Sequence, residues 1–215
     1  MLLSTRGLAP PIRTSIYEER YERTEAALAL SALKPGDSVL ELGTGIGFIS
    51  AILCLHGARV VHTFDPSPAV ERRAAETFRS NGVTPEHYRC VLGAGNGTTK
   101  FHLSDEFWAS STLRPEQHAD TIEVEVRSFN EFVNKHTPNF LVCDIEGGER
   151  ELLEYADLSS FDRIIMEVHP EVTGDDGALW VIDRLRSSGF VPDMRTVRDA
   201  TWLFVRGNAH AGHPD

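Results

Sequence analysis

The chain has 215 residues, of which 41% are hydrophobic and 25% charged, and it carries a formal net charge of −11. This composition is ordinary for one soluble globular domain, and no run of about 18 apolar residues exists that could span a membrane. Lys and Arg form no cluster of the kind that nucleic-acid substrates select. The three cysteines lie far apart in apolar stretches, as expected of buried thiols in a reducing compartment. We therefore expect a cytoplasmic protein with neither a membrane nor a nucleic-acid partner.

The first 34 residues are predicted to form a helical cover segment, and residues 35–215 one larger domain. A helix is expected over Ser15 to Leu33, because Ser15 and Glu18 form a capping-box pattern at its start. Tyr17 and Tyr21 fall on one face of this helix. They either cover a site or pack into the core, and the sequence favours neither.

A glycine-rich turn follows the first predicted strand, Ser38 to Leu42, and leads into a helix from about Phe48 to His56. Glycines at such a turn let a ligand approach the backbone where any Cβ would clash. The second strand, Arg59 to Phe64, is followed by Asp65, which stands 22 residues after Gly43. An acid at that spacing reaches the hydroxyls of a ribose. The pattern predicts an adenosine-containing cofactor.

The glycine spacing discriminates between two such cofactors. A dinucleotide fingerprint G-x-G-x-x-G that starts at Gly43 would need glycine at Phe48, whereas the third glycine is Gly47. With Glu41 before it, the loop resembles the nucleoside-binding loop of class I S-adenosylmethionine methyltransferases. Carboxylates near the loop suit the ammonium and sulfonium groups of that cofactor. A nicotinamide cofactor, or a ligand-free turn, remains the less favoured interpretation.

The rest of the chain continues to alternate strands and helices. This alternation predicts a parallel sheet with helices on both faces, and ligands at the carboxyl ends of the strands. Residues 104–119, which include Trp108, show no regular pattern. The predicted helices are a helix capped by Ser67 that ends at Asn81-Gly82, a short one opened by Ser128 and Glu131, Glu149–Tyr155 and Ala178–Arg186. The predicted strands are His87–Leu92, Thr98–Leu103, Thr121–Arg127, Phe140–Cys143, Arg163–Val168, Phe190–Pro192 and Thr201–Val205.

Acidic residues and a histidine follow two of these strands. Asp144 and Glu146 come after Phe140–Cys143, and His169 comes after Arg163–Val168. A histidine or a carboxylate at this edge can take the proton that a hydroxyl loses on methylation, so these three are the candidate catalytic residues. Two of them have plainer interpretations: His169 hydrogen-bonded to backbone, and Asp144 as a helix N-cap. Glu149, which comes after Glu146, is better explained as a first-turn helix charge than as a catalyst.

The same trio could hold Mg²⁺, Ca²⁺ or Mn²⁺. The metal pattern of catechol methyltransferases, which needs a downstream Asp-Asn pair, is absent. We therefore assign no metal ligand from the sequence.

The segment Asp144-Ile145-Glu146-Gly147-Gly148-Glu149 resembles the signature of FkbM-type methyltransferases, as do Ile165–His169 and the turn Gly93–Gly97. The similarity extends over roughly Pro35 to Phe190. It implies a Rossmann-like three-layer sandwich, with a seven-stranded, mostly parallel sheet whose last strand is antiparallel. It also implies methyl transfer from S-adenosylmethionine, usually to an oxygen of a sugar or small natural product.

One residue and one three-residue segment depart from this family's pattern. Glu41 stands where members often have aspartate, and Ser128-Phe129-Asn130 replaces the usual Thr-Leu-Asp. The missing carboxylate puts one substrate contact in doubt, and the neighbourhood of Trp108 matches nothing in the family.

We expect the cofactor to be S-adenosylmethionine. Glu41 and the loop glycines line its methionine end, Asp65 its ribose, and Pro66 and Ala94 its adenine. The full set of expected cofactor contacts is Tyr21, Glu41, Gly43, Thr44, Gly45, Gly47, Asp65, Pro66, Ala94 and Asp144. Transfer to a small amine, a nicotinamide oxidoreductase and a non-catalytic cofactor-binding scaffold are the alternatives. The acceptor and the oligomeric state, a homodimer included, stay open.

Overall fold

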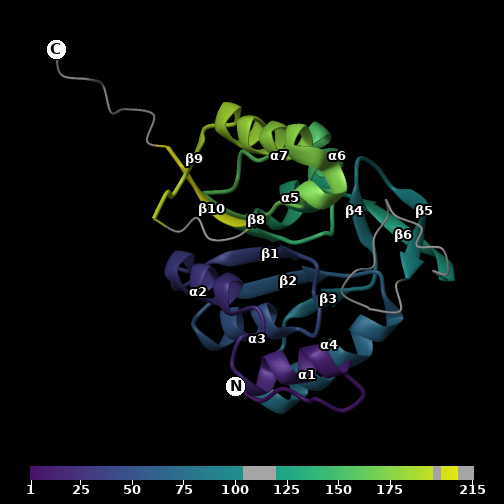
Figure 1. The fold of residues 1–215 in the computed structure, drawn as a ribbon. Coiled ribbons are helices and arrows are strands. Elements are labelled where there is room, and N and C mark those ends of the chain that lie inside the picture. The colour runs from purple at the N-terminus through teal and green to yellow at the C-terminus, as the bar shows by residue number, and fades with distance from the viewer. Residues whose placement is uncertain (104–119, 196–199, 208–215) are drawn as a thin grey trace.

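Strands and helices alternate along most of the chain in the computed structural model, which describes residues 1–103, 120–195 and 200–207 (Figure 1). Trp108 therefore lies outside the described residues. The helices are α1 (Pro10–Tyr17), α2 (Arg23–Ala32), α3 (Phe48–Leu55), α4 (Pro68–Asn81), α5 (Phe129–His136), α6 (Glu149–Tyr155) and α7 (Pro170–Ser187). The strands are β1 (Ser38–Leu42), β2 (Val60–Phe64), β3 (Glu86–Tyr88), β4 (Val91–Gly93), β5 (Gly97–Leu103), β6 (Asp120–Ser128), β7 (Phe140–Cys143), β8 (Arg163–Glu167), β9 (Phe190–Pro192) and β10 (Thr201–Arg206).

Seven strands form the central sheet, in the order β3-β2-β1-β7-β8-β10-β9. β1 pairs in parallel with β2 and β7, and Leu40 lies beside His62 on one side and Leu141 on the other. β10 runs antiparallel to both β8 and β9. The expected sheet, parallel except for its last strand, is confirmed.

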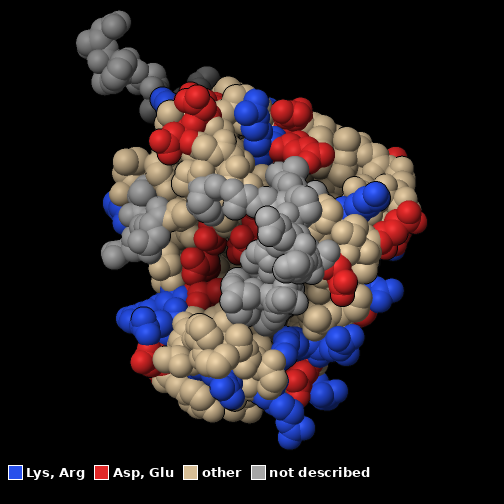
Figure 2. Space-filling model, turned by 45° about the vertical axis from the view of Figure 1, so that its right-hand side comes forward, with Lys and Arg blue, Asp and Glu red and all other residues tan. Residues whose placement is uncertain are grey.

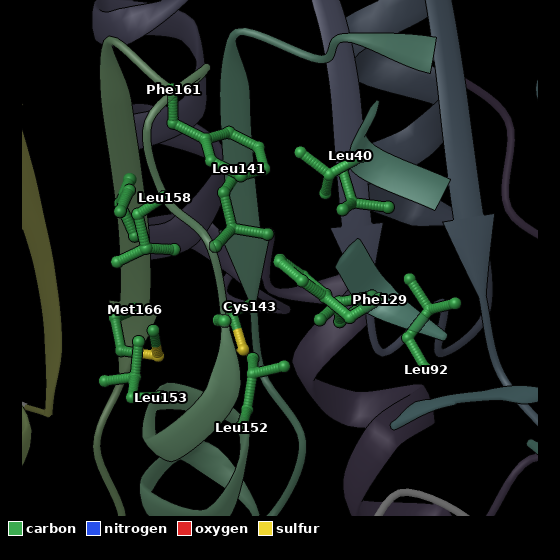
Figure 3. Packing of buried hydrophobic residues seen from close by; sticks show 14 of the residues in the cluster. Leu40, Leu92, Phe129, Leu141, Cys143, Leu152, Leu153, Leu158, Phe161 and Met166 are labelled. Carbon is green, nitrogen blue, oxygen red and sulfur yellow. The ribbon is translucent and has the colours of Figure 1, made fainter. Parts of the chain in front are cut away.

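Helices cover both faces of this sheet, with α2, α3 and α4 on one side and α5, α6 and α7 on the other (Figure 1). Side chains alternate along a strand, so neighbouring residues of β1 enter different layers. Val39 belongs to the cluster formed with α2 and α3, whereas Leu40 belongs to the cluster that also contains Phe129 of α5 and Leu153 of α6 (Figure 3). Because both faces are covered, all five residues of β1 are buried.

A second, three-stranded sheet of order β4-β6-β5 stands beside the main one. The prediction of one strand over His87–Leu92 is therefore wrong. Glu86–Tyr88 pairs with β2 in the main sheet, and Val91–Gly93 pairs with β6 in the second. The chain crosses between the sheets at Arg89 and Cys90. Residues 87–92 contain no Gly or Pro that would mark this change of partner.

The single helix predicted over Ser15–Leu33 is also wrong, because α1 and α2 are separate. Glu19 and Glu22 have φ values of 55° and 43°, which break the helix, and Ser15 lies inside α1 instead of capping it. The two helices bury different faces: Ile12 of α1 packs against Ile46, whereas Ala29 of α2 packs against the main sheet. One straight helix could not make both contacts.

Other boundaries follow their local signals. Ser67 accepts a hydrogen bond from the Val70 N–H at 3.4 Å, and Ser128 accepts one from Glu131 at 3.3 Å, so both predicted N-caps form. The predicted helix Ala178–Arg186 is part of the longer α7, which is interrupted at Gly174 (φ 74°, ψ 166°). Within the described part of the chain, no helix has both the length and the apolarity needed to cross a bilayer.

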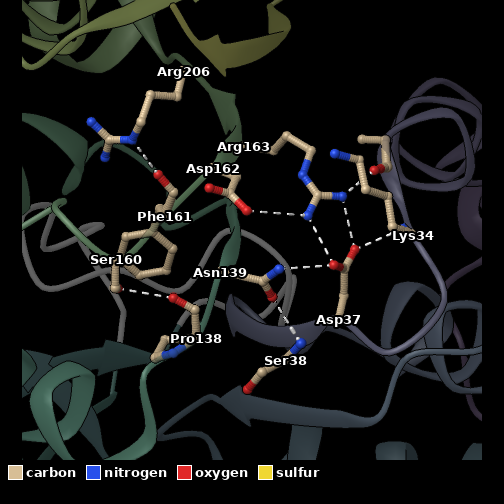
Figure 4. A network of polar contacts seen from close by, with 11 residues as sticks. Lys34, Asp37, Ser38, Pro138, Asn139, Ser160, Phe161, Asp162, Arg163 and Arg206 are labelled. Carbon is tan, nitrogen blue, oxygen red and sulfur yellow. Dashed lines mark hydrogen bonds and ion pairs between the residues drawn. The ribbon is translucent and has the colours of Figure 1, made fainter. Parts of the chain in front are cut away.

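A buried polar network connects the amino-terminal ends of β1, β7 and β8 (Figure 4). The glycine loop lies at the other end of these strands. The Arg163 guanidinium donates to both carboxylate oxygens of Asp37 at 2.8 Å. Asn139 donates to Asp37 and accepts from the Ser38 N–H, both at 2.9 Å. Burial alone would raise the pKa of Asp37, but the Arg163 hydrogen bonds hold it below its ordinary value.

Candidate active site

A cavity of about 490 Å³ opens at the carboxyl ends of β1, β2, β7 and β8. Figure 2 shows acidic side chains gathered in a hollow on this face of the molecule. Among the described residues that line it, eight carry a carboxylate and none is Lys, Arg or His. The acidic lining residues are Glu22, Glu25, Glu41, Asp65, Asp144, Glu146, Glu151 and Glu167.

The glycine loop after β1 forms one wall. Gly43 and Gly45 line the cavity and have positive φ, at 94° and 53°. A Cβ on Gly43 would lie 1.9 Å from the Asp144 carbonyl oxygen, so this glycine permits the close approach of β1 and β7 at the site. A Cβ on Gly45 would face Glu22 and Tyr21 at 3.5 and 3.8 Å, on the cavity side.

Three carboxylates of the cavity lie near that loop: Glu41 is buried, and Asp65 and Glu22 are half-buried. Glu41, at the end of β1, is 1% exposed and accepts a hydrogen bond from Ser50 of α3. Asp65 follows β2 and accepts a hydrogen bond from the Ser67 N–H at 2.9 Å. Burial raises the pKa of Glu41 and of Asp65 to about 7, and that of Glu22 to about 8. A bound cation would favour their charged forms.

A histidine and four carboxylates meet at the ends of β7 and β8. The Nδ1 atom of His169 lies 2.9 Å from Glu149 Oε1, and Glu149 also accepts from the Gly147 N–H at 3.1 Å. The Nε2 atom of His169 lies 3.6 Å from Glu146, 3.7 Å from Asp144 and 3.8 Å from Glu167. His169 and Glu149 are both buried, whereas Asp144, Glu146 and Glu167 line the cavity.

Burial and mutual repulsion control the charge of this group. Burial raises the pKa of Asp144 to about 6 and that of Glu167 to about 8. Burial alone would lower the pKa of His169, but the Glu149 hydrogen bond and the neighbouring carboxylates raise it to about 9. Glu146 has φ 54°, a conformation that non-glycine residues rarely adopt and that recurs at functional sites.

The structure brings most of the predicted site residues to one cavity. Tyr21, Glu41, Gly43, Gly45, Asp65, Pro66, Ala94, Asp144 and Glu146 line it. Thr44, Gly47 and His169 do not. Thr44 bonds to Thr63 at 2.6 Å, and a Cβ on Gly47 would meet Phe78 at 2.6 Å, so Gly47 permits close packing of the loop against α4. Tyr17 is 74% exposed and does not cover the site.

Asp144 does not cap α6, whose N-cap is Gly148. The sequence interpretation missed Glu149 as the partner of His169 and overlooked Glu167. Glu167 is the last residue of β8, at the same end of the sheet as Asp144, so its position was a usable signal. Glu22 and Glu25, which border α2 and face the cavity, had no signal of this kind.

The second sheet adds a wall that strand patterns could not locate. Thr99 and Phe101 of β5 and Val126 of β6 line the cavity opposite the glycine loop, and Tyr155 of α6 donates to the Leu92 carbonyl at 3.3 Å. This wall is mostly apolar. It extends the cavity beyond the residues expected to contact adenosine.

The cavity fits S-adenosylmethionine. Gly45 borders the cavity without a side chain, Asp65 stands at the position expected for a ribose contact, and the acidic lining complements an ammonium and a sulfonium. No phosphate-binding Lys or Arg lies among the described lining residues, which disfavours a dinucleotide pyrophosphate.

Comparisons with known proteins agree with this geometry. Residues 42–197 match the family model described as the methyltransferase FkbM domain. A ribosomal protein L11 methylase from Lactobacillus delbrueckii subsp. bulgaricus has a similar fold, with a TM-score of 0.52 and 16% identity over 85% of this chain and 77% of that one. Magnesium protoporphyrin IX methyltransferase from Synechocystis PCC 6803, solved with bound SAM, also has a similar fold. Its TM-score is 0.51 and its sequence identity 16%, over 94% of this chain and 86% of that one.

No curated protein matches the sequence. The two solved structures support the fold alone, since their sequences are distant. The family match, in contrast, extends over most of the chain and includes the glycine loop and the acidic strand ends. The chain therefore belongs to the FkbM methyltransferase family and is an S-adenosylmethionine-dependent methyltransferase.

Proposed function

We propose that this enzyme methylates a hydroxyl oxygen of an uncharged small molecule, such as a sugar or a natural product, and that Glu146 accepts the hydroxyl proton. The observation that carries the proposal is the cavity itself, with carboxylates at the strand ends and an apolar wall from β5 and β6 opposite them. S-adenosylmethionine supplies an activated methyl group on a sulfonium. The protein has to hold the acceptor oxygen in line with it and remove one proton.

Glu146 is the best placed of the three candidate bases. Its side chain is 31% exposed and lines the cavity, whereas His169 lies behind it at 3.6 Å and lines none of it. His169 is in turn fixed by Glu149. In this arrangement Glu146 contacts the acceptor, and His169 positions the carboxylates around it. Asp144, next to Gly43, contacts the cofactor.

The charge of the cavity also limits the acceptor. A polyanion such as RNA, or a phosphorylated or carboxylated metabolite, would meet carboxylates and no described Lys or Arg in the lining. A cationic amine would be attracted to the same carboxylates, so N-methylation of a small amine is the second candidate. Residues 1–34 contribute Tyr21, Glu22 and Glu25 to the cavity, which supports their role as a cover over the cofactor.

The test is a methyl-transfer assay with labelled S-adenosylmethionine and three acceptor panels: neutral polyhydroxylated compounds, small amines and total tRNA. We expect product only in the first panel, with mass spectrometry locating the new methyl on oxygen. Product in the amine panel would favour the second candidate, and product with tRNA would contradict both. Calorimetry with S-adenosylhomocysteine, with NAD as control, establishes cofactor binding independently.

The role of Glu146 is tested by Glu146→Gln, which keeps the shape of the side chain and removes the base. We expect kcat to fall by about 10²- to 10⁴-fold while the affinity for S-adenosylhomocysteine changes little. Glu154→Gln on the exposed side of α6 is the matched control. Full activity of Glu146→Gln would contradict the assignment.

A further inference from the structure

Three side chains that could each give one ligand atom to a metal ion lie close together at the ends of β7 and β8. One atom each from Asp144, Glu167 and His169 lies within 4.8 Å of the other two. Adjacent donors around an octahedral Mn²⁺ or Mg²⁺ ion are about 3.0 Å apart and opposite donors about 4.2 Å. The Nε2 atom of His169 lies 3.7 Å from Asp144 and 3.8 Å from Glu167, which is longer than the spacing of adjacent donors, so both carboxylates would move toward the imidazole by less than 1 Å when an ion binds. We propose that these three residues bind a divalent cation, of the Mn²⁺ or Mg²⁺ class.

The buried histidine is the observation that separates this site from an ordinary acidic patch. His169 is 6% exposed, and its Nδ1 atom is engaged by Glu149. Its Nε2 atom faces Glu146, Asp144 and Glu167, whose nearest oxygens lie 3.6, 3.7 and 3.8 Å away, each beyond the length of an ordinary hydrogen bond. A carboxylate that holds one imidazole nitrogen, so that the other presents its lone pair, is the outer-shell arrangement of metal-binding histidines.

Asp144 supplies a second observation. Its Oδ1 atom is buried and has no hydrogen-bond partner among the described residues. Apart from His169, no positively charged side chain in the described chain forms an ion pair with Asp144 or Glu167. A buried carboxylate oxygen without a partner is costly, and a divalent cation between Asp144 and Glu167 would offset the charge of both.

The donor set selects the class of ion. Two carboxylate oxygens and one imidazole nitrogen suit a hard or borderline cation, and the absence of thiolate donors disfavours Cu⁺. Asp144 and Glu167 line the cavity while His169 lies behind them, so the remaining coordination positions face the cavity. Under the proposed function, a hydroxyl that occupied one of these positions would be held beside Glu146, and its own pKa would be lowered.

Mn²⁺ titration of the purified full-length protein, stripped with EDTA and desalted, tests the site without an activity assay. We expect calorimetry and the loss of the free Mn²⁺ electron paramagnetic signal to show one saturable site, which Mg²⁺ displaces. Pulsed electron paramagnetic resonance should show hyperfine coupling between the bound Mn²⁺ and a nitrogen of His169. Glu167→Gln should weaken Mn²⁺ binding by more than about tenfold. Glu151→Gln, which removes another carboxylate of the same cavity, should change it less than about twofold.

The result can be separated from that of the proposed function. Binding of S-adenosylhomocysteine to Glu167→Gln at the affinity of the unaltered protein shows that the variant is folded and the cofactor site intact. If Mn²⁺ does not bind, or binds equally to Glu167→Gln and without nitrogen coupling, the metal site is refuted while methyl transfer stands. In that case a proton on Nε2 supplies the positive charge that the carboxylates need.

Discussion

The three glycines of the loop after β1 have different physical roles. Gly43 leaves room for the Asp144 carbonyl, Gly45 borders the cavity, and Gly47 leaves room for the ring of Phe78 from α4. The sequence pattern treats them alike, because all three are glycines at alternate positions. Only Gly43 and Gly45 reach the cavity, so the ligand-binding part of the motif is its first half.

Gly43→Ala should be much more destabilising than Gly36→Ala. Both glycines have positive φ, at 94° and 88°, so alanine is strained at either position. At Gly36 nothing lies within 4 Å of the new Cβ, and we expect a loss of about 1 kcal/mol from strain alone. At Gly43 the Cβ meets a backbone oxygen at 1.9 Å, and we expect about 3 kcal/mol or more. Urea unfolding measures both, and equal losses would show that the loop relaxes freely.

Single residues also show where sequence reasoning stops. Glu41, Asp65 and Asp144 could be predicted, because their positions after strands place them at one edge of any parallel sheet. Glu149 could not, since the first turn of a helix is an ordinary place for a glutamate. Its role depends on the turn that brings its Oε1 atom to His169, 20 residues later in the chain. The contacts of Glu22 depend on a helix break that the sequence pattern did not reveal.

At the scale of elements, the main sheet was predictable and its surroundings were not. Short apolar runs bounded by Gly, Pro and Asp define β1, β2, β7 and β8, and parallel pairing follows from the intervening helices. The separation of β3 from β4 depends on which strand each half pairs with, which local sequence does not encode. The same holds for α1 and α2, whose break depends on two different packing surfaces.

Among the polar interactions at the amino-terminal ends of the parallel strands, the Asp37–Arg163 ion pair should contribute most to the stability of the fold. Both side chains are about 5% exposed or less, so Asp37→Ala leaves a buried guanidinium without its carboxylate and should cost about 3–5 kcal/mol. Asp162→Ala is the control: Asp162 is 3.9 Å from the same arginine but 59% exposed, and its loss should cost less than about 1 kcal/mol. Urea denaturation measures both variants.

The pH dependence of this pair has a defined sign. The pKa of Asp37 is lower in the folded protein than its ordinary value, so the stability it contributes is present above about pH 4 and is lost as the pH falls through the folded value. The difference in stability between the parent protein and Asp37→Ala should therefore shrink below about pH 4. A difference that did not shrink at all as the pH fell below about 4 would contradict the charged pair as its source.

At the scale of the whole molecule, eight of the 32 acidic residues line one cavity, the candidate active site. Carboxylates from α2, β1, β2, β7 and β8 converge on one cavity, and burial keeps several of them partly protonated near neutral pH. In the ligand-free protein, the carboxylates of this cavity therefore repel one another once they ionise. A cofactor with two positive charges, on the ammonium and the sulfonium, offsets that repulsion.

This arrangement couples stability, cofactor binding and pH. Glu22, Glu41 and Asp65 have pKa values of about 7 to 8 in the folded protein, above their values near 4 in the unfolded chain. The stability that their protonated forms contribute is fully present below about pH 4 and is lost as the pH rises through the folded values. We expect the melting temperature of the ligand-free protein to fall between pH 5.5 and pH 8.5.

S-adenosylmethionine should reverse much of that loss, because it binds the ionised carboxylates best and stabilises the folded state by mass action. We expect its effect on the melting temperature to be larger at pH 8.5 than at pH 5.5, and larger than that of S-adenosylhomocysteine, which lacks the sulfonium. Thermal unfolding at both pH values measures this, with Glu41→Gln expected to flatten the profile and the exposed Asp157→Asn to leave it unchanged. Equal stabilisation at the two pH values would mean that the buried carboxylates do not contact the cationic end of the cofactor.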